Sequence, residues 1–498
     1  MKNFLLFLSL LLVAGFLVAC EDTTDFSDMA EVDAVEPVNV GPGDGGETAV
    51  SATYQTADCP IDIPRGYDVE CGYLTVPENR TQANSPTIEL AVAIVAASEG
   101  ADYPPVIYLA GGPGGSGLDD FAADPAGWDY PFTRNRDLIL FDQRGTGYSI
   151  PTLDCPEFTT ADESENPDAL CYDRLVDEDI DLSAYNTVEN AADVAALREA
   201  LGIEEWDLLG ISYGTRLALA VMKDHPAGVR SVVLDSVFPP NVDTPLEDAL
   251  STMDGLNRLF ADCAQDDYCA QQYPDLEAVF LEAVAALNED DSAPIYGDDL
   301  LFAVSNALND TELIPLLPRV IWEVADGNYD ALDEISTESA YGRLTYQSSD
   351  ADYSDSEGMY NSVICHDEYV AGDYDRVETA VVGQVPVELE AALLQGAYDL
   401  TTVCDYWNPQ QRVDNTAVSS RIPTLILAGQ YDVATPVRWA RLAAKTLPNA
   451  YVYEFPGSGH SLLSGGECAI DITTQFLNDP QSAPDDGCIA NMDWPNFE

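Results

Sequence analysis

A serine between two glycines, at the point where an apolar run gives way to a helical pattern, constrains the fold of this chain most. Gly210-Ile-Ser-Tyr-Gly214 follows the apolar run at 206–209 and precedes Thr-Arg-Leu-Ala-Leu-Ala at 215–220. This order predicts a strand, a sharp turn and a helix. Flanking glycines allow a turn too tight for Cβ atoms, which holds the serine in a strained conformation with its hydroxyl exposed. The pattern therefore predicts a nucleophilic serine at the end of a buried strand.

Strand-like and helical segments alternate on both sides of this turn. Strands are expected at 71–77, 88–95, 105–110, 137–141, 206–209, 231–235, 423–429 and 450–455, and helices at 190–201, 274–287, 311–325, 436–447 and 470–477. Such alternation predicts an α/β protein with a mostly parallel sheet flanked by helices. Helical patterns dominate 241–418, so we expect a large, mainly helical cap inserted between sheet strands, with core segments at 51–240 and 419–498.

A serine nucleophile needs a base and an acid that orients the base. The chain has three histidines. His225 ends the helix after the serine, His366 lies in the cap, and His460 lies in a glycine-rich loop after the last predicted strand. Asp432 follows the strand before it. The order Ser212, Asp432, His460 is typical of the α/β-hydrolase fold, so we expect that fold and a Ser-His-Asp triad.

An acyl-transfer site also needs backbone N–H groups that face the developing oxyanion. The residue after the nucleophile, Tyr213, is expected to supply one of them. The glycine-rich turn at 111–115 is expected to supply the other, from Gly112, because Pro113 has no N–H.

Four motifs in this order carry a resemblance to a known family. The chain resembles the proline iminopeptidases and tripeptidyl aminopeptidases, and in particular their exported, tripeptidyl branch, over about residues 52–490. Two departures are that Ala110 replaces the family's histidine and that the serine motif lacks its tryptophan. We expect Asp142 and Arg144 of the second motif to stabilise their turn. The motifs are Ala110-Gly-Gly-Pro-Gly114, Asp142-Gln-Arg-Gly-Thr-Gly-Tyr-Ser149, Gly210-Ile-Ser-Tyr-Gly-Thr215 and Gly429-Gln-Tyr-Asp432 with Thr435-Pro436.

The resemblance implies a serine exopeptidase that acts near the free N-terminus of peptides and needs no metal or organic cofactor. An α-ammonium group would be bound by a carboxylate in a partly desolvated pocket. Asp367 and Glu368, in the cap, are the candidates that the resemblance suggests. An esterase or lipase that uses the same triad is an alternative, as is a non-catalytic binding protein on the same scaffold.

The first twenty residues are typical of a bacterial lipoprotein signal peptide. Lys2 precedes an apolar run at 4–18, and Leu-Val-Ala-Cys20 resembles a lipobox, which would place a lipid anchor on Cys20. An ordinary signal peptide is the alternative. Residues 21–50 are acidic and glycine-containing, as in a flexible tether. We therefore expect an exported protein anchored to a bacterial membrane, on its periplasmic or cell-surface side.

The cysteine count agrees with export. Of eleven cysteines, ten remain when Cys20 is set aside, which suggests five disulfides, although the sequence does not fix their connectivity. No cysteine or histidine spacing suggests a zinc site. Pairing between sequence neighbours is the simplest hypothesis: Cys59 with Cys71, Cys155 with Cys171, Cys263 with Cys269, Cys365 with Cys404, and Cys468 with Cys488.

The formal net charge of −68 makes nucleic acid an unlikely partner, because phosphates would be repelled. Acidic residues are spread along the whole chain, which is typical of a solvated acidic surface in a salty medium. Attraction of cationic substrates is the alternative interpretation.

Overall fold

A computed structural model describes residues 52–497, except 162–164, 291, 336–354, 369–372, 408–412 and 493–494. The predicted signal peptide, the lipidation site Cys20 and the tether lie outside these residues. The described residues all belong to one compact unit that begins at Ala49.

One nine-stranded sheet organises this unit, in the order β1-β2-β3-β5-β4-β6-β7-β8-β9. The first three strands pair antiparallel with one another, and β3 pairs antiparallel with β5, whereas all pairs from β5 to β9 are parallel. This confirms the predicted α/β-hydrolase fold. The strands are β1 Thr53–Ala57, β2 Val69–Pro77, β3 Thr87–Val95, β4 Val106–Leu109, β5 Leu138–Phe141, β6 Trp206–Ile211, β7 Val229–Asp235, β8 Thr424–Gly429 and β9 Ala450–Phe455.

Helices cover both faces of the parallel part, and the strand side chains alternate between two cores. In β8, for example, Ile426 packs into the core with α4, α5 and α14, and Leu427 packs into the core with α1 and α15. The strands read as continuous apolar runs because both faces are buried. The helices are α1 Gly117–Ala123, α4 Thr187–Ala200, α5 Tyr213–Asp224, α14 Val437–Ala444 and α15 Glu467–Asn478, with α2 Glu157–Thr160 and α3 Pro167–Asp177 between β5 and β6.

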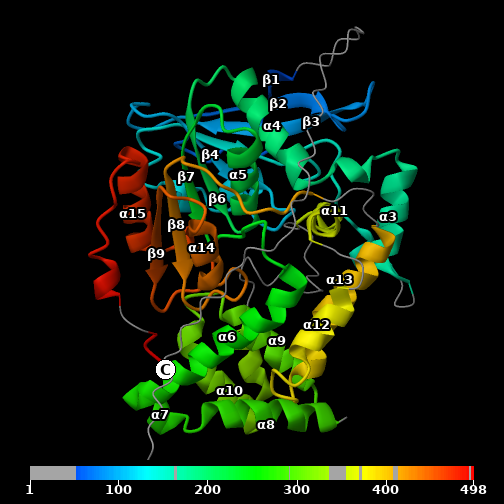
Figure 1. Ribbon diagram of the computed structural model, residues 1–498, viewed down its shortest axis with the longest axis vertical. Helices are drawn as coiled ribbons and strands as arrows, with labels where there is room; N and C mark the ends of the chain where they lie inside the picture. The colour runs from blue at the N-terminus through cyan, green and yellow to red at the C-terminus, as the bar shows by residue number, and fades with distance from the viewer. Residues whose placement is uncertain are drawn as a thin grey trace, which may run out of the picture. The chain divides into compact units, whose positions relative to one another are not determined.

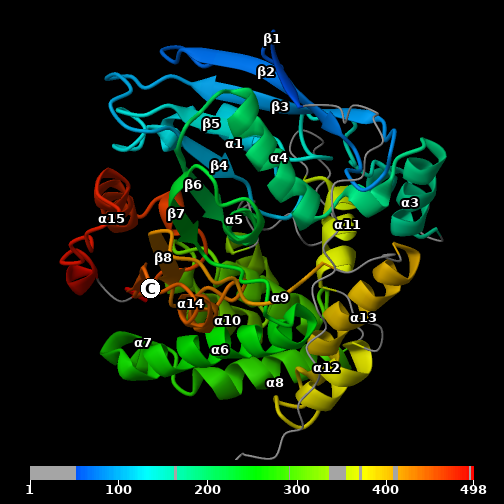
Figure 2. The same ribbon diagram turned by 45° about the horizontal axis from the view of Figure 1, so that its top comes forward.

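A helical insertion separates β7 from β8, as expected, and has its own apolar core. Figures 1 and 2 show α6 to α10 together at one end of the sheet, with α12 and α13 beside them and α11 next to α3 and α13. The helix expected at 311–325 is shorter than predicted, because Pro315 and Pro318 lack the N–H that a helix interior needs. The helices are α6 Thr244–Gln265, α7 Asp267–Gln272, α8 Leu276–Glu289, α9 Gly297–Ala307, α10 Leu317–Ala325, α11 Glu357–Asp367, α12 Asp373–Val381 and α13 Glu390–Tyr406.

Five disulfides join the ten cysteines in the neighbour pairing that the sequence suggests. Within the part of the chain that the structure describes, no helix combines the length and apolarity that crossing a membrane would require.

Candidate active site

Ser212 stands on a sharp turn between β6 and α5, with φ 54° and ψ −124°. These angles are costly for a residue with a side chain, and the surrounding backbone enforces them. A Cβ on Gly210 would lie 2.3 Å from the Gly214 carbonyl oxygen, and a Cβ on Gly214 only 1.9 Å from the Leu109 oxygen. The two glycines are therefore required by close backbone approach, as the sequence pattern predicts.

His460 and Asp432 form a buried hydrogen-bonded pair. The Nδ1 atom of His460 lies 2.9 Å from Oδ2 of Asp432, and the two residues follow β9 and β8. Thr435 donates to both carboxylate oxygens, from its backbone N–H and its hydroxyl, each at 2.6 Å. Burial alone would raise the pKa of Asp432, but His460 and Thr435 outweigh it and leave the pKa below its ordinary value. The carboxylate is thus charged and able to orient the imidazole.

The other two histidines have different surroundings. His225 is the C-cap residue of α5. His366 is buried in α11, and burial lowers its pKa to about 4. Because His460 is paired with a carboxylate that follows a sheet strand, it fits the role of base best.

The glycine-rich turn after β4 lies against the serine. A Cβ on Gly111 would lie 3.2 Å from Cβ of Ser212 and 3.8 Å from its Oγ. Gly112 follows with φ +100°. Tyr213 is the first residue of α5, where a backbone N–H has no acceptor within its own helix. Tyr213 thus follows the serine directly, and Gly112 follows the glycine that lies beside it; their role as an oxyanion hole stays a prediction.

Asp142 and Gln143 of the second motif hydrogen-bond to residues at the two ends of this turn. Gln143 donates to the Ala110 carbonyl at 3.0 Å, so the position where the family has histidine is bound through its backbone. Asp142 is buried, and its Oδ1 accepts from the Ser116 hydroxyl at 2.9 Å and from the Leu118 N–H at 3.0 Å. Burial raises the pKa of Asp142 to about 7.

Arg144, from the same motif, points away from the turn. Its guanidinium binds both oxygens of Asp193, at 2.7 and 3.0 Å, and the carbonyl oxygens of Glu78 and Ala184. These contacts give Arg144 the structural role expected from the sequence.

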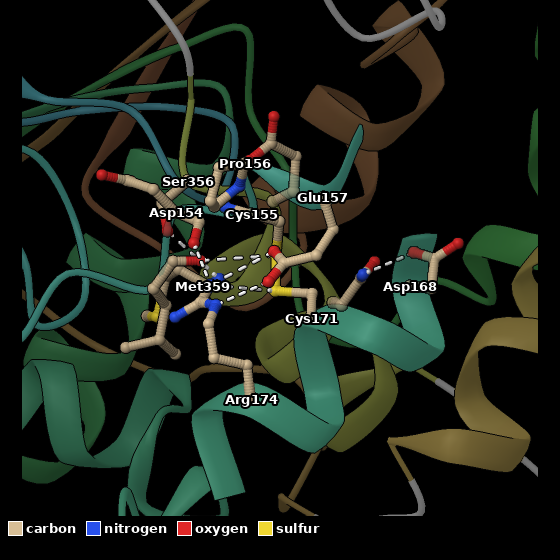
Figure 3. Close-up of a disulfide and its surroundings, with 12 residues drawn as sticks. Asp154, Cys155, Pro156, Glu157, Asp168, Cys171, Arg174, Ser356 and Met359 are labelled. Carbon is tan, nitrogen blue, oxygen red and sulfur yellow. Dashed lines mark hydrogen bonds and ion pairs between the residues drawn. A yellow bond between two sulfur atoms is a disulfide. The ribbon is translucent and has the colours of Figure 1, made fainter. Parts of the chain in front are cut away.

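The cap reaches the turn through the start of α11. The Ser356 N–H donates to the Gly114 carbonyl at 3.1 Å, and the Gly358 N–H to the Leu153 carbonyl at 3.0 Å. The segment that follows Leu153 is joined to α3 by the Cys155–Cys171 disulfide, and beside this disulfide Arg174 forms an ion pair with Glu157 (Figure 3). In the described residues, the side chains of Cys155, Glu157 and Cys171 form the one group with the spacing of metal ligands. The disulfide consumes both thiolates, so this group does not fit a metal ion.

Asp367 and Glu368, the substrate-binding candidates, lie at the other end of α11. Both are buried and face Arg216, which stands one helical turn after Ser212 in α5. Arg216 Nε lies 3.5 Å from Oδ2 of Asp367, and its Nη2 forms an ion pair with Glu368. Burial raises the pKa of both carboxyl groups, and Arg216 opposes the shift. Two carboxylates thus share one guanidinium close to the nucleophile.

Hydroxyl groups complete this cluster. Thr187 donates to Asp367 and lies 2.8 Å from the Tyr213 hydroxyl, while Thr244 donates to Glu368 at 2.7 Å. Sequence reasoning missed Arg216. The available signal was a basic side chain inside the helical run Thr-Arg-Leu-Ala-Leu-Ala, in a chain with only 20 basic residues.

A serine on a strand–helix turn, with an aspartate–histidine pair on later parallel strands, defines an α/β hydrolase. A family model described as the alpha/beta hydrolase fold matches residues 104–466. The chain therefore belongs to the α/β-hydrolase fold family.

Several relatives of the chain bear the names of peptidases. The chain is 26% identical to serine protease Hip1 of Mycobacterium tuberculosis over 455 residues, covering 82% of this chain and 85% of the relative. It is 25% identical to the proline iminopeptidase of Xanthomonas citri over 365 residues, which is 72% and 83% of the two chains. It is 31% identical to the tripeptidyl aminopeptidase of Streptomyces coelicolor over 216 residues, which is 39% and 40%. These matches confirm the resemblance to hydrolase-fold peptidases.

Proposed function

We propose that this protein is a serine aminopeptidase that hydrolyses peptide bonds near the free N-terminus of peptides. The observation that carries the proposal is the buried Asp432–His460 hydrogen bond, at the sheet edge where the strained turn presents Ser212. The peptidase names of the relatives favour amide substrates over simple esters.

In the proposed reaction, Oγ of Ser212 attacks the scissile carbonyl while Nε2 of His460 takes the hydroxyl proton. Asp432 keeps Nδ1 protonated and stabilises the imidazolium. The N–H groups of Gly112 and Tyr213 donate to the oxyanion. His460 then returns the proton to the leaving amine as the C–N bond breaks, and water hydrolyses the acyl-enzyme by the same route.

The cluster at the end of α11 supports recognition of a free N-terminus. Asp367 and Glu368 carry two formal negative charges against the single positive charge of Arg216, and all three are buried. The surplus negative charge would favour an α-ammonium group, because a buried charge needs a partner. An acetylated N-terminus lacks that charge and would be rejected.

A peptide library with matched free and acetylated N-termini tests this specificity, with mass spectrometry of the products. We expect short peptides or single residues to be released from the free N-termini only, and Ser212→Ala to abolish the release. Equal cleavage of the acetylated partners, with faster turnover of simple esters, would contradict the aminopeptidase assignment.

We also propose that the protein is exported and anchored through a diacylated Cys20. Five disulfides support an oxidising compartment, because cytosolic thiols are kept reduced. In a bacterial host, the wild-type chain should partition with membranes and incorporate labelled fatty acid, and Cys20→Ser should do neither. Labelling that survives the substitution would reject the anchor.

A further inference from the structure

Asp235, the last residue of β7, has no role in the triad, yet it contacts both the nucleophile and the loop that carries the base. It is fully buried. Its backbone carbonyl accepts the Ser212 N–H at 3.0 Å. Its side chain accepts the N–H groups of Leu462 at 3.0 Å and of Leu463 at 2.9 Å, one on each oxygen. One residue therefore joins the serine turn to the chain directly after His460.

Ser236 continues this connection. It has φ 59°, its own N–H donates to the Leu427 carbonyl, and its hydroxyl accepts the Ser461 N–H at 2.8 Å. Three successive N–H groups after His460 thus end on Asp235 and Ser236. Such a nest of N–H groups stabilises an anion.

The charge of Asp235 matters because of what faces it. Burial raises its pKa to about 6, against the opposing effects of the Leu462 and Leu463 N–H groups and of His460. Asp235 and the His460 side chain are therefore close enough to interact electrostatically. Tyr130 is a further titratable group that interacts with Asp235, and its hydroxyl donates to the Leu463 carbonyl at 3.2 Å.

We propose that Asp235, together with Ser236, is a positioning residue that fixes the His460 loop relative to Ser212, and that its carboxylate stabilises the imidazolium formed during catalysis. The inference rests on the proposed function, because it assumes that Ser212 and His460 react together. A purely structural anchor would be needed for folding but would leave the protonation behaviour of the reaction unchanged.

The test compares Asp235→Asn with Asp207→Asn. Asp207 is an equally buried carboxylate at the opposite end of the sheet, where it binds Arg136, Arg230 and Ser231. Both changes remove one buried negative charge, and only the first lies beside the proposed site. The rate of Ser212 labelling by a fluorophosphonate, and kcat and KM on a peptidyl arylamide, are measured against pH.

For Asp235→Asn we expect kcat and the labelling rate to fall about tenfold to a hundredfold, with KM little changed, because small misplacements of a base are costly. The acid limb of both pH profiles should move to lower pH, because asparagine cannot take up the proton that Asp235 binds near its raised pKa of about 6. Asp207→Asn should lower the melting temperature without moving the acid limb. An unmoved acid limb in Asp235→Asn, or a kcat within twofold of wild type, would overturn the proposal.

If Asp235→Asn does not fold, the proposal is tested with Ser236→Ala instead. It removes the acceptor of the Ser461 N–H and the hydroxyl that donates to Oδ1 of Asp235 at 3.3 Å. We expect a severalfold loss of kcat at constant KM, whereas an unchanged kcat counts against the anchor. Labelling also separates the two hypotheses. If the fluorophosphonate labels the wild-type protein but free and acetylated peptides are cleaved equally, only the aminopeptidase specificity is refuted. If the wild-type protein is not labelled, both hypotheses are refuted.

Discussion

Replacing Arg216 by methionine should lower the free energy of unfolding of the protein, by an amount that depends on pH. Arg216 is 2% exposed and pairs with Asp367 and Glu368, which are 1% and 5% exposed. Removing one partner of a buried ion pair typically costs about 3–5 kcal/mol, because the other charge is left unpaired. We expect a loss of that size near neutral pH, with part of it due to the packing of Arg216 over Phe238, 4.8 Å from the ring centroid.

The pH dependence follows from the two carboxyl groups. Burial already raises their pKa values, and Arg216 opposes the rise. Without Arg216 the folded-state pKa values lie still further above those of the unfolded chain. A group of this kind contributes stability when protonated and loses it as pH rises through the folded-state pKa. The deficit relative to wild type should therefore be larger at about pH 8 than at about pH 5.

Urea unfolding of both proteins at the two pH values measures the deficit. Arg441→Met is the matched control, because Arg441 forms an ion pair with Glu454 at 2.6 Å but is 64% exposed. Exposed pairs contribute at most about 1 kcal/mol, so this variant should stay close to wild type at both pH values. A deficit for Arg216→Met that is the same at both pH values would refute the reasoning.

Three further predictions concern the cap. The Asn309 side chain accepts the N–H groups of Val433 and Ala434, beside Asp432. Asn309→Leu should therefore lower kcat about tenfold, and Asn309→Asp, which keeps an acceptor, should retain the wild-type kcat; steady-state kinetics of the two variants test this. Removing the Cys365–Cys404 disulfide, with a separation of 39 residues, should cost about 4 kcal/mol, against about 2 kcal/mol for Cys263–Cys269 with a separation of 6; equal shifts in urea midpoint would contradict the loop-entropy argument. His366→Gln should leave the acid limb of kcat/KM unchanged, since burial keeps His366 neutral above about pH 4, and a moved limb would show that His366 titrates in the reaction.

The sequence predicted most of the sheet because its signals are local. The run at 137–141 is buried on both faces, and the structure has a strand at 138–141. The run at 450–455 is bounded by turns, and the structure has a strand with the same bounds. The edge strand β1 was missed because only Tyr54 among its five residues is even half-buried, so the alternation that marks a strand is absent. The helix expected at 311–325 failed at its prolines, which tolerate only a first helical turn.

The candidate site divides in the same way. Ser212, Asp432 and His460 could be singled out as candidates because each lies within five residues of a strand end and their order matches that of the fold. Arg216, Asp235 and Asn309 could not, because their roles arise from contacts across long stretches of chain. Asp235, for instance, meets residues more than 220 positions away. A buried carboxylate at a strand end carries no local sign of whether it anchors a loop or faces solvent.

The cap's bonds to the catalytic loops have a consequence for which molecules can enter. The Asn309 carbonyl accepts the His460 N–H at 2.8 Å, the Thr311 hydroxyl accepts the Gly459 N–H at 3.0 Å, and the Ser356 N–H donates to the Gly114 carbonyl. A cap that lifted as a rigid body would break these bonds and disturb the His460 loop and the glycine-rich turn together. We therefore expect the cap to stay in place while substrates bind. Flexible peptide ends would then be able to reach Ser212, whereas folded proteins would be too large to do so.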